Sequence, residues 1–561
     1  MKSLLKNILL VSWSPLLLVS FSLSAQQKNE EVTIIAPYIP SVGDAAKITF
    51  RPEISPGEEE KPSFEYNYLS KKLDSRLELD PIEPLKYSQG GQETLYRNFA
   101  KAGLGNYGTP YLDFLAGSLQ SEKHLFGVRL KHLSSQGKIR DYPTSAYSNN
   151  LISVFGKMFT STHSLSAKIA YNRDVNHFYG FKPDSLWDIY YDEDDLKQRF
   201  QHVQGSLEIG SNYRDEYRLN HRFNAEFHYY SDYYETRESE VSFTAVFNKK
   251  LRSTGRDFTH SAGIEVGVEF FNYTDTTRTS NPVYFPLYPV YRLSFGPYRF
   301  EAGIRFNLLT GNNAGGEAPG VDVFPVLKAE VVVLENQVKA FAEISGEHTT
   351  NSFRDLTGFN PFMISTPELV DTDEQIRVGG GITGNFSGVN FTADAFYSYF
   401  NDMPLFVNDT TWGLRNRFDV IYDNMNLLKL SASLGYVKIS GLTARLRAAY
   451  YLYTPKNEEK AWHLSNFEAG FDAGYTFKEK YTVKVSVLSL GSKYAKTWEE
   501  GAVVASKIKG ALDLGAGFDY RINRMVLAYV DVNNILNQHY QRWYGYPVQG
   551  ILVMAGVKIS F

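Results

Sequence analysis

Apolar and polar residues alternate along most of this chain in segments as long as a β-strand, and this pattern constrains the fold more than any other feature. Segments 164–172, 219–229 and 442–452 each place apolar side chains on one face and polar, often charged, side chains on the other. A period of two belongs to strands, whereas an amphipathic helix repeats every 3.6 residues. Beyond residue 25 no apolar run reaches the ~18 residues of a membrane-spanning helix, so we expect an all-β chain.

The first 25 residues have the features of a secretory signal peptide. Lys2 and Lys6 give a positive start, an apolar core runs over residues 8–23, and small residues precede a cleavage point after Ala25. A retained membrane anchor is the alternative, but Pro15 and several serines interrupt the apolar run. We therefore expect an exported protein whose mature chain begins after residue 25.

Composition narrows the class of protein further. The chain has 39 Tyr and 38 Phe but no Cys, which excludes disulfides, thiolate metal sites and thiol catalysis. A formal net charge of −4 gives no sign of a nucleic-acid partner. An exported, Cys-free and aromatic-rich chain with short alternating segments predicts a transmembrane β-barrel in the cell outer membrane, in contact with its lipid. A soluble β-sandwich is the alternative.

The connections between the alternating segments fall into two lengths. Short turns such as 335–336 and 387–388 alternate with long polar loops such as 349–374 and 535–548. Short turns at one end and long loops at the other are typical of outer-membrane barrels. Residues 96–561 hold about 22 strand candidates, an even number as antiparallel closure requires. We therefore predict a transmembrane antiparallel barrel of about 22 strands over this range.

The alternating pattern continues to the last residue of the chain. Val557, Ile559 and Phe561 are apolar, while Lys558 and Ser560 lie between them. A last strand without a neighbour would be an exposed edge, which folded proteins avoid. We therefore expect this strand to pair with the first one and close the barrel. We also predict that the three apolar residues form a signal for the outer-membrane insertion machinery.

Residues 26–95 differ from the rest of the chain. They are rich in Pro and Glu and show little periodicity, which indicates an extended segment. A barrel of about 22 strands encloses a wide lumen that such transporters plug. The segment could line or obstruct that lumen, or it could be a linker in the periplasm, and the sequence leaves both open.

The C-terminal stretch resembles the last two strands of TonB-dependent receptor barrels. The matching positions are an Asn-hydrophobic-Leu-Asn segment at 534–537, Tyr540, an aromatic stretch with Gly and Pro at 544–547, and Phe561. The stretch 422–437 resembles another strand of the same barrels, and the likeness covers roughly residues 95–561. The resemblance implies uptake or passage of a ligand across the outer membrane. Residues 26–95 are too few for the globular plug domain of that family.

The sequence "EEVTIIAPY" resembles a TonB box, the segment through which such receptors engage a TonB-like periplasmic energising protein. The contacting residues would be Glu31, Val32, Thr33, Ile34, Ile35 and Ala36. Such a box adds an extended strand to the sheet edge of its partner, where backbone hydrogen bonds give affinity. An ordinary hydrophobic strand in a linker is the alternative.

The last long loop gathers four aromatic residues, Tyr540, Trp543, Tyr544 and Tyr546. These side chains could stack on a ligand or hold a partner, and we treat the loop as a candidate extracellular recognition site. The alternative is an aromatic girdle at the outer leaflet of the membrane.

The sequence gives no indication of an enzyme. The 11 His residues are scattered without the spacing of metal ligands, and no nucleophile elbow or phosphate-binding loop is present. We therefore predict no catalytic residue, no metal site and no cofactor. Two functions remain: ligand uptake by a receptor-like barrel, or a non-transporting subunit or scaffold of an outer-membrane complex. The second would be occluded by the N-terminal segment or by another outer-membrane or surface protein.

Overall fold

The computed structural model describes residues 97–118, 123–183, 191–253, 258–311, 319–411, 413–499 and 501–561. The predicted signal peptide, the segment 26–95 and the candidate box at 31–36 lie outside these ranges. Among the described residues, no helix is both long enough and apolar enough to cross a membrane.

The described chain forms a closed antiparallel barrel of 22 strands, as the sequence predicts. The sheet contains 23 strands, of which the two-residue β10 (Thr279–Ser280) only extends the ladder on β9. The wall strands are β1 (Asn98–Gly105), β2 (Thr109–Gly117), β3 (His124–Ser135), β4 (Tyr147–Phe159), β5 (His163–His177), β6 (Lys197–Ser211), β7 (Asn220–Ser231), β8 (Arg237–Leu251), β9 (Phe258–Thr274), β11 (Val283–Phe295), β12 (Tyr298–Thr310), β13 (Gly320–Leu334), β14 (Val338–Thr349), β15 (Thr372–Phe386), β16 (Val389–Asn408), β17 (Phe418–Tyr436), β18 (Leu442–Pro455), β19 (Phe467–Phe477), β20 (Tyr481–Leu490), β23 (Ala511–Arg521), β24 (Val526–Asn533) and β27 (Leu552–Ser560).

The remaining elements belong to the connections. They are the 3₁₀ helix η3 (Glu193–Leu196), the short helix α2 (Phe353–Phe359), the hairpin β21 (Lys493–Glu499) and β22 (Ala502–Ile508), and the small hairpin β25 (Gln541–Trp543) and β26 (Tyr546–Pro547). Each wall strand pairs with the next one along the chain, with β20 passing to β23 and β24 passing to β27 across these insertions.

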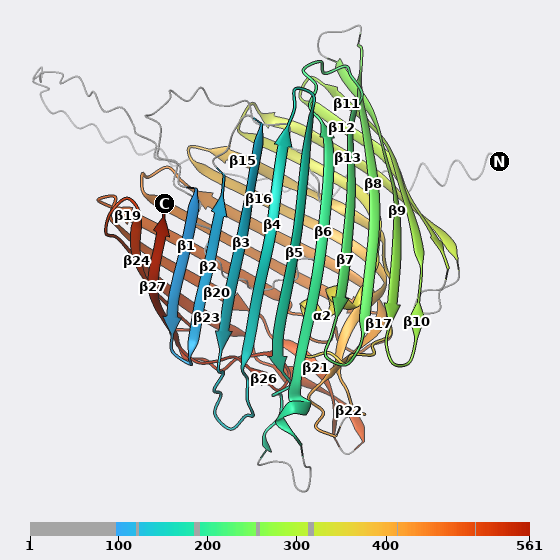
Figure 1. The fold of residues 1–561 in the computed structure, drawn as a ribbon. Coiled ribbons are helices and arrows are strands. Elements are labelled where there is room, and N and C mark those ends of the chain that lie inside the picture. Colours follow the sequence, from blue (N-terminus) through green and yellow to red (C-terminus); the bar gives the residue numbers. More distant parts are fainter. Residues whose placement is uncertain are drawn as a thin grey trace, which may run out of the picture. The chain divides into compact units, whose positions relative to one another are not determined.

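The first and last strands close the barrel, which confirms the expected pairing of the C-terminal strand. β1 and β27 run antiparallel, from Phe99 opposite Ser560 to Gly105 opposite Met554. The backbone N–H of Phe561 donates to Asn98 at 3.0 Å, so the ladder continues to the last residue. Figure 1 shows the blue β1 beside the red β27 in the wall. The strand pattern therefore leaves no open edge in the sheet.

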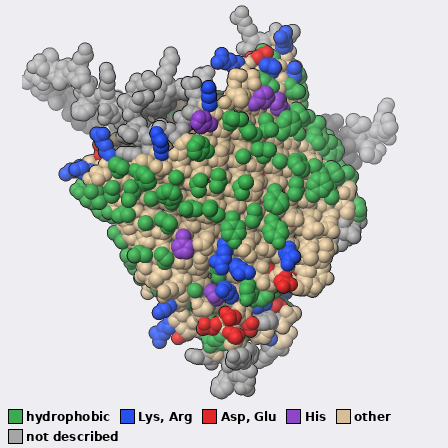
Figure 2. Space-filling view, in the orientation of Figure 1, with side chains coloured by type: hydrophobic (Ala, Val, Ile, Leu, Met, Phe, Trp, Pro, Cys, Tyr) green, Lys and Arg blue, Asp and Glu red, His purple; other side chains and the backbone are tan. Residues whose placement is uncertain are grey.

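The outer face of the wall is apolar, which is the pattern of transmembrane β-barrels. On β4, Ile152 and Val154 are about half exposed, whereas Ser153 between them is buried. The same alternation repeats around the barrel, and Figure 2 shows hydrophobic side chains spread over the middle of the visible wall. An apolar outer face of this kind is the surface that transmembrane barrels present to the membrane.

Charged side chains project from the other face of the same strands and pair either between neighbouring strands or across one intervening strand. Such pairs neutralise charges that a lipid-facing position could not tolerate. Five of them are Arg129–Asp113, Arg292–Glu301, Arg299–Glu330, Arg305–Glu347 and Lys484–Asp531.

The connections sort by length between the two ends of the barrel. The turns 296–297 and 387–388 lie at one end, and the long connections 350–371, 491–510 and 534–551 lie at the other. Figure 1 shows β21, β22 and β26 gathered beyond the wall at this second end. In bacterial outer-membrane barrels the longer loops face the outside of the cell. We call this second end the loop end.

Candidate functional site at the loop end

Side chains from loops and strand ends form one buried cluster at the loop end, which we call the mouth cluster. It combines residues of the wall with residues of the connections that follow β14 and β24. Its buried members are Phe200, Tyr230, Phe271, Tyr273, Tyr284, Leu309, Phe353, Leu356, Met363, Leu369, Phe406, Phe418, Val420, Trp543 and Tyr546. Burying so many large rings is the main favourable contribution to holding these loops together.

Helix α2 supplies part of this cluster. It begins after Ser352, whose Oγ accepts a hydrogen bond from the backbone N–H of Asp355 at 3.0 Å. Phe353 and Leu356, three residues apart, lie on one side of the helix and are buried. The Ser-x-x-Asp spacing at 352–355 is a sequence-level helix start that could have located α2 from the sequence.

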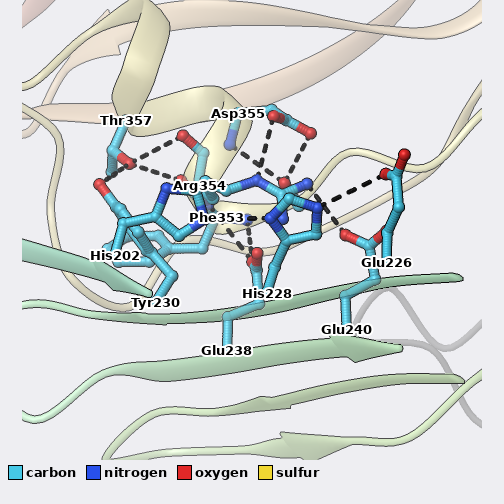
Figure 3. A network of polar contacts seen from close by, with 11 residues as sticks. His202, Glu226, His228, Tyr230, Glu238, Glu240, Phe353, Arg354, Asp355 and Thr357 are labelled. Carbon is cyan, nitrogen blue, oxygen red and sulfur yellow. Dashed lines mark hydrogen bonds and ion pairs between the residues drawn. The ribbon is translucent and has the colours of Figure 1, made fainter. Parts of the chain in front are cut away.

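The wall strand β8 holds the start of α2 through two glutamates. Glu238 Oε2 accepts hydrogen bonds from the backbone N–H groups of Phe353 at 2.6 Å and Arg354 at 3.3 Å. The guanidinium of Arg354 lies 2.9 Å from Glu240 Oε2. Figure 3 shows both glutamates reaching from β8 towards the helix. Since Glu238 is fully buried, its Oε2 depends on these backbone donors, whereas its Oε1 has no hydrogen-bond partner among the described residues.

A second set of polar contacts lies beside the first (Figure 3). Tyr230 on β7 and Thr357 on α2 share a hydrogen bond of 2.8 Å between their hydroxyl groups. His202 on β6 and His228 on β7 approach to 3.1 Å, and the other ring nitrogen of His228 lies 3.7 Å from Glu226. The sequence showed these histidines only as scattered residues, because their proximity depends on strand pairing.

The connection that carries α2 is also joined to β17 by its backbone. Met363 forms an isolated parallel bridge with Phe418. The backbone N–H of Ile364 donates to Phe418 at 2.8 Å, and that of Phe418 donates to Phe362 at 3.0 Å. The loop therefore crosses the loop end and is attached at β8 on one side and at β17 on the other.

The four aromatic residues of the candidate recognition loop occupy different environments. Tyr546 is buried, with its ring stacked 3.8 Å from that of Phe362 and its hydroxyl bonded to the carbonyl of Asn416. Trp543 is buried against Phe406, with ring centroids 5.1 Å apart. Both pack on other loops and strand ends, in the interior of the mouth cluster.

The other two members of the recognition loop are more accessible. Tyr540 donates a hydrogen bond of 2.9 Å to Asp513 on β23. Tyr544 is 37% exposed and offers the largest free surface of the four. A ligand or partner that meets this loop without moving it would therefore meet Tyr544 first.

A buried histidine supports the recognition loop. His463, in the connection between β18 and β19, is almost fully buried and packs on Trp543 with ring centroids 5.1 Å apart. Burial lowers the pKa of His463 to about 3, so the imidazole is neutral. Its Nδ1–H donates to the carbonyl of Phe406 at 2.9 Å, and its Nε2 faces the backbone N–H of Tyr544 at 3.4 Å.

The predicted insertion residues lie on β27 at the closure of the barrel. Val557 and Phe561 are exposed on the outer face, while Lys558 between them is buried. This agrees with the alternation read from the sequence, and the role of Val557, Ile559 and Phe561 in insertion stays a prediction.

The fold has many counterparts among solved structures, although no protein-family model and no curated protein matches the sequence. The ferric-catecholate import receptor Fiu from Escherichia coli K12 is 10% identical with a TM-score of 0.63, over 84% of this chain and 82% of that chain. The siderophore receptor PirA from Acinetobacter baumannii is 10% identical with a TM-score of 0.64, over 84% and 81%. The copper transporter OprC is 12% identical with a TM-score of 0.58, over 85% and 83%.

The likeness is one of fold. The barrel has the strand number and closure of siderophore and metal receptors of the outer membrane. Those neighbours are receptors and transporters, in agreement with the prediction that the chain is not an enzyme. At about one residue in ten identical, they do not identify a ligand for this chain.

Proposed function

We propose that this protein is an outer-membrane receptor barrel that admits a ligand at its loop end and passes it into the lumen. The observation that carries the proposal is the mouth cluster, in which connections pack on the ends of wall strands across the loop end. Helix α2 is held by Glu238, Glu240 and the rings around Phe353, and each of these contacts can separate without breaking a wall strand pair. Such a cluster can open while the barrel stays intact.

In this proposal the protein contacts an energising protein, outer-membrane lipid, the insertion machinery and the ligand. The box residues Glu31, Val32, Thr33, Ile34, Ile35 and Ala36 would add a strand to a TonB-like periplasmic energising protein. The apolar outer face would contact outer-membrane lipid, after recognition of Val557, Ile559 and Phe561 by the insertion machinery. Of the four loop residues Tyr540, Trp543, Tyr544 and Tyr546, the more accessible Tyr540 and Tyr544 would meet the ligand or an extracellular partner, while the buried Trp543 and Tyr546 would hold the loop in place.

A specific observation favours the second function, a scaffold that does not transport. The mouth cluster is packed like a protein core, with Phe353, Phe418 and Tyr546 all but inaccessible to solvent. A permanently closed loop end would suit a subunit whose task is to hold other outer-membrane or surface proteins.

Isolation of the native protein with its companions decides between the two functions. The protein is extracted gently from its membrane, as the full chain and as a variant lacking residues 30–37, and bound proteins are identified by mass. A periplasmic energising protein that is lost with residues 30–37 supports the receptor. Stoichiometric outer-membrane or surface proteins that are indifferent to the deletion support the scaffold.

A single substitution tests the box more sharply. Ile34→Pro removes a backbone donor and fixes φ, so it should prevent strand addition. We expect the variant to lose crosslinking to the energising protein, with Ser41→Pro, outside the box, as a control that retains it. Unchanged crosslinking in Ile34→Pro would contradict the energised form of the proposal.

A further inference from the structure

Three neighbouring wall strands bring a histidine and two aspartates together at the loop end. Asp322 lies on β13, His348 on β14 and Asp373 on β15, and one ligand atom from each lies within 4.8 Å of the others. Asp373 is the direct cross-strand partner of His348 in the register of β14 and β15. The three donors are thus placed by the strand ladder, which is the most rigid part of the molecule.

The distances suit a small cation. His348 Nδ1 lies 2.8 Å from Asp373 Oδ1 and 3.8 Å from Asp322 Oδ2. Metal–ligand bonds of about 2.0–2.2 Å separate the donors of a tetrahedral zinc ion by about 3.4 Å. The two observed distances bracket that separation, so small side-chain rotations would bring the donors to it.

The second ring nitrogen of His348 faces a carboxylate, a group that commonly supports metal-bound histidines. His348 Nε2 is buried without a hydrogen bond and lies 3.5 Å from Asp371 Oδ2. Asp371 is in turn held by the hydroxyl of Tyr284 at 2.7 Å. Metal-ligating histidines almost always direct their second N–H to a carboxylate, a backbone carbonyl or water, which fixes the ring orientation and raises its basicity.

The charges at this place also favour a cation. In the described part of the chain, the ion pairs of Asp322, Asp371 and Asp373 all go to His348. The side chain of His348 is 10% exposed, so three carboxylates share one largely buried imidazole. Asp373 and Asp322 are 21% and 36% exposed, whereas Asp371 is buried, and buried carboxylates are normally paired or coordinated to a metal.

We infer that Asp322, His348 and Asp373 form a binding site for a divalent first-row transition metal, with zinc as the best match to one imidazole and two carboxylates. Asp371 and Tyr284 orient the imidazole behind the site. The connection that carries α2 begins two residues after His348 and ends two residues before Asp373. A bound ion would therefore hold the two ends of this connection together. This inference does not depend on whether the barrel transports a ligand.

Zinc binding to the purified barrel tests the inference. The full chain in detergent is freed of metal with a chelator, and Zn²⁺ and Mn²⁺ are titrated by calorimetry with metal content measured by mass spectrometry. We expect about one equivalent of Zn²⁺. His348→Ala should abolish this binding, and Asp371→Asn should weaken it by about 10- to 100-fold, because Asp371 acts only through the imidazole.

The control variant is His132→Ala on β3, whose ring hydrogen-bonds Asn150 and Ser134 and has no carboxylate partner among the described residues. It should bind Zn²⁺ like the parent. Equal binding by the parent and His348→Ala, or no binding of Zn²⁺ or Mn²⁺ by the parent, would overturn the inference. If His348→Ala does not fold, judged by its heat-modified migration on gels, Asp322→Asn replaces it, since Asp322 is the most exposed of the three.

Discussion

Lys101 and Lys558 lie directly opposite each other across the seam that joins the first and last strands. Like charges in direct cross-strand register repel each other. Here two carboxylates, Asp531 on β24 and Asp519 on β23, compensate for this repulsion. Asp519 lies 3.1 Å from Lys558, and Asp531 lies 3.7 Å from Lys101. Both ammonium groups also lie over the ring of Tyr529, at 4.3 Å for Lys101 and 5.6 Å for Lys558. The closure of the barrel is therefore tied to two strands beyond the seam.

Replacement of Asp519 should weaken this closure. Asp519→Asn removes the carboxylate that pairs with the buried Lys558 and with Lys484, and Asp519 is itself buried, so the lost stability should be about 3 kcal/mol. The free energy of unfolding in detergent, measured by urea titration, checks this. Asp472→Asn is the matched control, because its pair with Arg447 is exposed and should change stability by less than about 1 kcal/mol. Equal effects of the two variants would contradict the role given to Asp519.

Gly556, which lies on β27 at the seam, should not tolerate replacement by a residue that has a side chain. A Cβ at Gly556 would lie 2.0 Å from the carbonyl oxygen of Ala102 and 2.8 Å from the ring of Tyr529. Gly556→Ala should therefore displace β1 from β27 and cost about 1–3 kcal/mol. Gly435→Ala is the control, since its nearest neighbour would be 3.8 Å away. The fraction of heat-modifiable barrel after refolding measures both, and an equal yield would contradict the prediction.

The attachment of α2 should depend on the ring of Phe353. This side chain is fully buried in the mouth cluster, so Phe353→Ala should cost about 3–5 kcal/mol of local stability. We expect trypsin to cut the 350–371 connection faster, while the wall strands stay resistant. Tyr544→Ala, at an exposed position of the same end, should leave the rate unchanged. A rate that does not respond to Phe353→Ala would show that the ring does not hold the loop.

Acid should loosen the recognition loop through His463. Its folded pKa of about 3 lies below its ordinary value of 6.5, so the unfolded state binds the proton more tightly. Stability from the neutral imidazole is present above pH 6.5 and is lost as the pH falls towards 3. Quenching of Trp543 fluorescence by acrylamide, read as the difference from Trp543→Phe, should rise over this range. His463→Gln, which does not titrate, should flatten the profile, and an unchanged profile would contradict the assignment.

The alternation of apolar and polar residues determined where most wall strands lie and which of their side chains face outward. It places Ile152 and Val154 outside and Ser153 inside, and it predicts closure through a last strand that ends at Phe561. This worked because lipid and lumen impose opposite requirements on alternate residues, so each strand carries the information locally. The helix start at Ser352 is equally local, because Ser352 and its capping partner Asp355 are only three residues apart.

The arrangement at the loop end was decided only by the tertiary structure. Trp543 and Tyr546 were recognisable as aromatic loop residues, but nothing near them in the sequence indicates that they pack on Phe406 and Phe362. Loops lack a repeating environment, so their contacts carry no periodic signal.

The same contrast holds for the proposed metal site. His348 and Asp373 are 25 residues apart, and a 22-residue connection separates their strands. They meet because strand register sets them opposite each other, and Asp322 joins them from the next strand. By itself, the sequence determined which residues lie on the outer face of the wall, because that choice is made residue by residue. Which residues face each other was decided by register and loop packing, because those depend on pairings between distant segments.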